Sequence, residues 1–262
     1  RGGRKKKRQQ AAHPVGKECS PAPAAAIAIS GPDRARLLFD ALASELSSCG
    51  ASGVPFTPAV RALLGRLTAP DLGIAPGDFE TLRDTDAEMG VAEVYTDAGL
   101  TVYIFCLRKG SRIPLHDHPD MHVMARTLVG RLQIKSYTPE ERLQFPGSEG
   151  ADRIDGSGSP LCGYLASVHQ DEVLGPEPTT FELNPRDGNI HELLALEDAA
   201  FLDITTPPYS DACGRPCTYY ASAPASTDST TRFVLTPTPA TDMRAVAVPY
   251  RGPPFCPTSA QF

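Results

Sequence analysis

The sequence has no long apolar run. Nowhere do its 262 residues approach the roughly 18 consecutive apolar residues that suggest a transmembrane helix, so we expect no membrane-spanning helix. A signal-peptide pattern is also missing, because no apolar stretch follows the basic residues at the start. With 41% hydrophobic and 21% charged residues, the composition is ordinary for a globular protein.

A disulfide framework is a second feature that the sequence lacks. Its seven cysteines are an odd number and are scattered along the chain, which is typical of proteins from a reducing compartment. Cys213 and Cys217 lie four residues apart, but no second cysteine pair or nearby histidine completes a zinc site. We therefore do not predict structural zinc there.

Acidic residues are missing from residues 1–17, which contain seven lysines and arginines. The whole chain has 25 basic and 31 acidic side chains, so the remainder has 18 against 31, about −13. A basic tail on an acidic body is typical either of a nuclear-import or polyanion-binding arm, or of a solvated tail that carries no targeting signal. Residues 20–29 are rich in Ala and Pro, so we predict a tail and linker over 1–31 and a single domain over 32–262.

Two helices are predicted ahead of a β-rich region. Apolar residues recur every three or four positions over 33–50, and Thr57 followed by Pro58 is typical of the start of a second helix. From Val91 the pattern changes to short strands separated by turns, which predicts a mainly-β sandwich or barrel. The turn-rich residues 139–160 predict a long surface loop, and the proline-rich C-terminal part carries no assignment. The expected strands cover 91–97, 100–107, 112–118, 121–129, 131–137, 161–167, 180–184, 189–197 and 200–206.

The stretch from Gly110 to Gly130 carries the main chemical signal. His116 and His118 lie two positions apart in a predicted strand, where residues i and i+2 point to the same face, so both imidazoles can reach one metal ion. His191 opens a later strand after a turn that contains Pro and Gly. A lone histidine is more often a satisfied core or surface residue, but this pattern indicates a metal site formed by His116, His118 and His191.

A carboxylate ligand is absent from this motif. The glycine-bounded strands and the later histidine resemble the two-motif signature of cupins. Many cupins carry a glutamate ligand four residues after the second histidine, where this chain has His122. No carboxylate of the motif lies near enough to replace this glutamate, so we expect a site whose protein ligands are neutral.

Four longer stretches carry a family resemblance. They are IPLHDHPDMHV (113–123), GRLQIKSY (130–137), PRDGNIHEL (185–193) and LDITTPPYSDACGRPCTYY (202–220). They resemble the plant cysteine oxidases, which with animal 2-aminoethanethiol dioxygenase form one branch of the thiol dioxygenases. The resemblance covers about residues 33–222, interrupted by the 139–160 loop, and the opening RKKKRQQ is also similar to the plant proteins.

The resemblance implies a cupin double-stranded β-helix, a jelly-roll barrel, with short N-terminal helices. It implies that His116, His118 and His191 hold Fe(II), which keeps its full positive charge among three neutral ligands and favours a thiolate.

By the same resemblance, O2 oxidises an N-terminal cysteine of a protein, such as an ethylene-response transcription factor, to the sulfinic acid. The oxidised protein is marked for arginylation and degradation through the N-degron pathway, which makes the enzyme an oxygen sensor. We expect a monomer of the nucleus and cytoplasm with no direct role on nucleic acid or membranes.

Further residues match the family pattern. Asp203 matches its acidic residue and would hold the α-ammonium of the substrate by a charge-assisted hydrogen bond; the alternative is a solvated aspartate at a strand end. Tyr209 would donate to bound dioxygen or thiolate; the alternative is a core tyrosine with a satisfied hydroxyl. Cys217 and Tyr219 also match, and a thioether between them is conceivable but not predicted. Asp120 stands where the family usually has glycine, and aspartate tolerates the left-handed backbone better than most residues.

Two other classes of function stay open. One is a cupin enzyme that uses Zn, Mn or Ni for isomerisation or hydrolysis, and the other is a metal-free cupin that serves as a binding or storage module. Iron content and thiol-dependent oxygen uptake separate a thiol dioxygenase from the first. The presence of all three histidines argues against the second, since a binding module does not need them.

Overall fold

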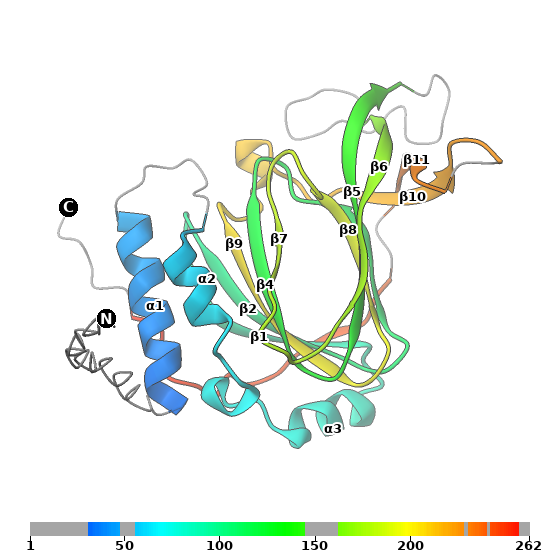
Figure 1. Ribbon diagram of the computed structural model, residues 1–262. Helices are drawn as coiled ribbons and strands as arrows, with labels where there is room; N and C mark the ends of the chain where they lie inside the picture. Colours follow the sequence, from blue (N-terminus) through cyan, green and yellow to red (C-terminus); the bar gives the residue numbers. More distant parts are fainter. Residues whose placement is uncertain (1–30, 48–55, 145–161, 228–229, 240–241, 257–262) are drawn as a thin grey trace, which may run out of the picture.

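The chain folds as a β-barrel with helices packed on one side (Figure 1). The computed structural model describes residues 31–47, 56–144, 162–227, 230–239 and 242–256. Within this part of the chain, no helix is both long and apolar enough to cross a membrane. The helices are α1 (Gly31–Ser47), α2 (Pro58–Leu64), the 3-10 helix η1 (Ala69–Leu72), α3 (Pro76–Asp84) and the 3-10 helix η2 (Asp211–Cys213).

The strands form two sheets. The first has the order β12 (Ala245–Ala247), β1 (Met89–Thr96), β2 (Thr101–Leu107), β9 (Ala199–Thr206), β4 (His122–Val129) and β7 (Phe181–Leu183). The second has the order β10 (Tyr219–Pro224), β11 (Arg232–Thr238), β6 (Gly163–Leu174), β5 (Leu132–Leu143), β8 (Ile190–Ala195) and β3 (Arg112–Asp117). The second sheet closes on itself, because β3 pairs with both β8 and β10. Every pair is antiparallel except β1 with β12.

The chain passes back and forth between the two sheets. Strands β2, β4, β7 and β9 belong to the first sheet, whereas β3, β5, β6 and β8 belong to the second. Two antiparallel sheets built by such alternation form a jelly roll. The predicted mainly-β jelly roll with N-terminal helices is therefore confirmed.

The first sheet has one face toward the helices and one toward the barrel interior. Along β2, Val102, Ile104 and Cys106 pack in the same cluster as the buried leucines of α1 and α2. The alternate side chains, Tyr103 and Phe105, line a cavity inside the barrel. This follows from the two-residue period of a strand, and it leaves the interior face free to carry functional groups.

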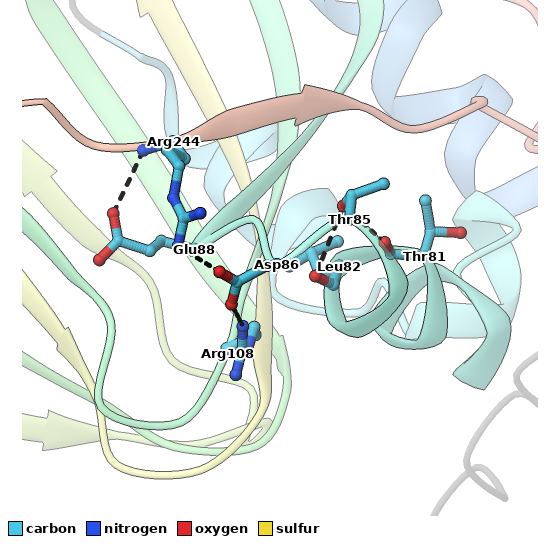
Figure 2. Close-up of polar contacts among 7 residues, drawn as sticks. All are labelled: Thr81, Leu82, Thr85, Asp86, Glu88, Arg108 and Arg244. Carbon is cyan, nitrogen blue, oxygen red and sulfur yellow. Dashed lines mark hydrogen bonds and ion pairs between the residues drawn. The ribbon is translucent and has the colours of Figure 1, made fainter.

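The C-terminal segment adds an edge strand, β12, to the first sheet. Asp86 lies between two guanidinium groups (Figure 2). Its carboxylate is 2.8 Å from the Arg244 guanidinium and 3.2 Å from the Arg108 guanidinium. The backbone N–H of Arg244 donates to the Glu88 carboxylate, and its carbonyl accepts from the N–H of Glu88. Further on, Phe255 packs edge-on against aromatic rings of α1 and β1. The proline-rich end thus forms a strand and part of the core, which its sequence pattern does not predict.

The long hairpin of β5 and β6 differs from the sequence prediction. We predicted a loop from residue 139, but β5 continues to Leu143 and β6 extends from Gly163 to Leu174. The outer half of β5 is largely exposed and polar, so it lacks the apolar alternation that identifies a half-buried strand. The hairpin projects beyond the barrel (Figure 1), and residues 145–161 lie outside the described residues.

Other predictions agree with the structure or fall outside it. Thr57 caps α2 by accepting a hydrogen bond from the N–H of Val60, with Pro58 at the first position. The remaining predicted strands overlap observed strands. Helix α3 and the strands β10 to β12 were not predicted. The predicted basic tail, Cys19 and Cys49 lie outside the described residues.

Arg126 joins β4 to the helical layer. Its side chain is buried and donates to the carbonyls of Gly65, Leu67 and Pro176 at 2.7, 3.0 and 3.2 Å. Burial lowers the pKa of this guanidinium. A buried cation is tolerated here because three backbone acceptors replace its water.

We expect Arg126→Met to destabilise the protein by about 3–5 kcal/mol, because it leaves three carbonyls without their donors. Arg131→Met is the control, since Arg131 forms an exposed ion pair with Glu197, and it should cost less than about 1 kcal/mol. The free energy of unfolding in urea measures both changes. Equal losses for the two variants would contradict the structural role of Arg126.

Candidate metal centre

Three histidines meet inside the barrel. His116 lies on β3, His118 follows directly after that strand, and His191 lies on β8. His116 and His191 are paired in register, so their side chains share one face of the sheet. One ring nitrogen from each histidine lies within 4.8 Å of the other two. The structure thus brings together the three residues that the sequence indicated.

A β-bulge sets this arrangement. Ile113 pairs with Leu193 and His116 with His191, so β3 uses one residue more than β8 over the same length. Pro114 lies in the bulge, where its missing N–H breaks no ladder hydrogen bond. The Pro114 carbonyl is 2.7 Å from Nδ1 of His116. Since a carbonyl only accepts, Nδ1 of His116 carries the proton and Nε2 offers a lone pair.

The nitrogens are spaced as ligands of one ion. The Nε2 atoms of His118 and His191 are 3.2 Å apart. Metal–nitrogen bonds of about 2.0–2.1 Å, set at right or tetrahedral angles, would separate two ligand nitrogens by about 2.8–3.4 Å. The residues present therefore fit a metal ion held by three imidazoles.

Burial keeps the three imidazoles in the form that binds metals. It lowers the pKa of His116 to about 4 and the pKa values of His118 and His191 well below their usual range. Neutral imidazole is the ligand form, so no proton has to be displaced near neutral pH.

Tyr209 and Asp117 support His118. The Tyr209 hydroxyl donates to the Asp117 carbonyl at 2.7 Å and lies 2.9 Å from Nδ1 of His118. Because its proton is used by that carbonyl, the hydroxyl accepts from Nδ1–H, which leaves Nε2 of His118 for a metal. The Asp117 carboxylate accepts from the Thr218 N–H and the Tyr220 hydroxyl. Burial raises the pKa of Asp117 to about 6.

Asn189 ties the two histidine-bearing segments together, and sequence reasoning missed it. Its Oδ1 accepts from the N–H of His118 at 3.3 Å, and its Nδ2 donates to the His118 carbonyl at 2.7 Å and the Asn184 carbonyl at 3.1 Å. It lies two residues before His191, but the contact with His118 spans 71 residues. No local pattern predicts such a contact.

Asp203 faces the same cavity from β9. The cavity has a volume of about 480 Å³ and is lined by the three histidines, Asp203 and Tyr209, together with aromatic and aliphatic side chains. The Asp203 carboxylate is buried and accepts from the Thr205 hydroxyl at 2.8 Å. Burial raises its pKa to about 6. It is the only acidic side chain lining the cavity among the described residues.

The remaining candidates lie around this centre. Cys217 is a free thiol that interacts with the hydroxyls of Tyr209 and Tyr219 at the cavity wall. Asp120 adopts a left-handed backbone with φ of 56°, which aspartate tolerates better than most residues. His122 lines a separate hollow beside Arg61 and Glu182.

Comparison with known proteins identifies the family to which the chain belongs. A family model described as PCO_ADO matches residues 63–255. The chain belongs to this family. The PCO_ADO match confirms the family resemblance and extends beyond residue 222, where we had expected it to end, into the C-terminal segment.

Individual PCO_ADO relatives are moderately similar. Plant cysteine oxidase 2 of Arabidopsis thaliana is 33% identical over 181 residues, which cover 67% of this chain and 60% of the relative. Human 2-aminoethanethiol dioxygenase is 32% identical over 62% of this chain and 63% of its own length. The chain thus spans less than two thirds of these relatives. A rmlc-like cupin protein from Desulfovibrio desulfuricans is 12% identical, with a TM-score of 0.28, over 46% of this chain and 84% of that protein.

We expect Asp203→Asn to stabilise the metal-free protein at pH 7.5 by up to about 3 kcal/mol, from a pKa raised by about two units. Because the folded-state pKa lies above the unfolded value, protonated Asp203 favours the fold below about pH 4, and this contribution is lost as the pH rises through about 6. The gain in the variant should therefore vanish at pH 4.

Thermal melting of both proteins across this pH range measures the effect. Asp84→Asn is the control, because Asp84 is exposed and a substitution there should change the stability by less than about 0.5 kcal/mol. A gain from Asp203→Asn that does not depend on pH would contradict a buried, destabilising carboxylate.

Proposed function

We propose that this protein is an iron-dependent thiol dioxygenase whose substrate is a cysteine with a free α-ammonium group. The observation that carries the proposal is the pairing of a neutral three-histidine group with one buried carboxylate, Asp203, in a single cavity. The family membership of the chain and the names of its relatives support the same class of reaction.

The ligand group suits Fe(II). His116, His118 and His191 would hold it, and no carboxylate joins the group among the described residues. When bound, the ion would supply a full positive charge that favours the thiolate form of the substrate and open positions for thiolate and O2. The thiol and one O2 together contain all the atoms of the sulfinic acid, so the reaction needs no other reductant.

Asp203 would select the substrate by its charge. A buried carboxylate with one hydroxyl partner is under-solvated, and an ammonium group that reaches it forms a charge-assisted hydrogen bond. Tyr209 would act mainly on His118, since its hydroxyl is already bonded to the Asp117 carbonyl and the His118 ring. This differs from the direct donation to oxygen or thiolate that we expected from the sequence.

The proposal extends to proteins with an N-terminal cysteine. Such a terminus offers the thiol and the α-ammonium that the site would bind. Oxidation of transcription factors of the ethylene-response type would then couple their N-degron-dependent degradation to oxygen. The basic residues 1–17 are the basis for placing this activity in the nucleus as well as the cytoplasm.

We expect a Cys-initiated peptide to gain two oxygen atoms, about 32 mass units, when incubated in air with the Fe(II)-loaded protein, and about 36 units under ¹⁸O2. The same peptide with an acetylated N-terminus is the control, and its rate should be at least tenfold lower because Asp203 loses its partner. Mass spectrometry measures both. Label that enters mainly from water, or equal rates for the two peptides, would contradict the proposal.

We expect Tyr209→Phe to weaken Fe(II) binding by about 10- to 100-fold, because His118 loses the hydroxyl that fixes its ring and tautomer. Competition with a metal chelator measures the affinity. Tyr250→Phe is the control, since the Tyr250 hydroxyl bonds to the Pro253 carbonyl outside the cavity lining. Unchanged affinity in Tyr209→Phe would show that the hydroxyl does not support the ligand.

A further inference from the structure

The cavity is larger than a single cysteine and changes character along its length. The part of the cavity at the histidines, called the polar level here, has polar cross-strand pairs: Tyr103 pairs with Asp203 and His116 pairs with His191. At the next level, Phe105 pairs with Phe201 and Ile113 with Leu193, and all four line the cavity. Its volume of about 480 Å³ lies within the range of about 300–1,000 Å³ that encloses drug-sized ligands. A cysteine held at the polar level therefore leaves an apolar space unfilled.

Met243 forms part of the wall of this cavity, and it comes from outside the jelly roll. It is half-buried and lies two residues before Ala245, which pairs with Met89 of β1. Met89 also lines the cavity. The segment that leads into β12 thus places the Met243 side chain against the space where the substrate would lie.

The position of Met243 is fixed by its neighbour Arg244. The Arg244 guanidinium is 2.8 Å from the Asp86 carboxylate (Figure 2). The N–H of Arg244 donates to the Glu88 carboxylate, and the Arg244 carbonyl accepts from the N–H of Glu88. These contacts hold the segment immediately before β12 against the loop that enters β1. Met243 is thereby held at the cavity by the side-chain and backbone bonds of the adjacent Arg244.

We infer that Met243 is a specificity-determining residue, which binds an apolar side chain on the residue that follows the reacting cysteine. This inference rests on the proposed function. An apolar group fits because the described side chains that line the cavity include no lysine or arginine, so an acidic side chain would be buried without a cation. The one acidic group, Asp203, is engaged by the α-ammonium in the proposed binding mode. Methionine suits such a wall, since its flexible thioether adapts to side chains of different shape.

Peptides that differ only at their second residue test the inference. With the Fe(II)-loaded full chain, kcat/KM for a Cys-Leu peptide should exceed that for the matching Cys-Asp peptide by at least about tenfold. Met243→Ala should lower the Cys-Leu to Cys-Gly ratio of kcat/KM about three- to fivefold, because part of the apolar contact is lost. Met243→Lys should reverse the preference and favour Cys-Asp over Cys-Leu.

Val246→Ala is the matched control. Val246 lies on β12 itself and packs toward the helices, so both ratios should stay within about twofold of the wild-type values. If Met243→Ala and Met243→Lys leave the ratios unchanged while Cys-Gly is still oxidised, the specificity role is wrong and the dioxygenase proposal stands. If the wild-type protein oxidises none of the peptides, the proposed function fails and the inference fails with it.

Discussion

The cross-strand pairing of His116 with His191 is the constraint on which the site depends. Both side chains must point into the barrel at the same level, and a shift of one residue along either strand would turn one of them to the other face. The bulge at Pro114 adjusts this register locally and supplies the carbonyl that fixes the His116 tautomer. Asn189 and Tyr209 then position His118, which lies beyond the end of its strand. The rest of the jelly roll maintains this pairing.

The site carries polar groups that a barrel built only for stability would not contain. Three imidazoles are held neutral by burial, and Asp117 and Asp203 are carboxylates whose pKa values are raised by burial. Each costs free energy unless a partner compensates. Asp117 has two donors from its own chain, whereas Asp203 has one. Asp203, the carboxylate with fewer hydrogen-bond donors, is the one that faces the cavity, which is typical of a group that binds a ligand.

Local sequence signals predicted much of the fold and the core of the site. The spacing of His116 and His118, the strand alternation from Val91 onward and the Thr57–Pro58 cap are short-range patterns, and each corresponds to the structure. Asn189 and Met243 could not be predicted in this way, because their roles depend on contacts across distant parts of the chain. The outer part of β5 was missed for a different reason, since polar side chains on both of its faces leave no apolar period to detect.

The pairing of β12 with β1 also affects how the protein folds during its synthesis. Arg244 bonds to Glu88 across 156 residues, so β1 gains its second neighbour only after the segment around Arg244 has left the ribosome. Until then, the edge of the first sheet exposes unpaired N–H and C=O groups, which can pair with another chain. Contacts of such long sequence separation also slow folding, because the loop must close before the contact forms. A chain truncated before residue 242 would therefore keep its histidines and expose an open sheet edge, and we expect such a fragment to aggregate.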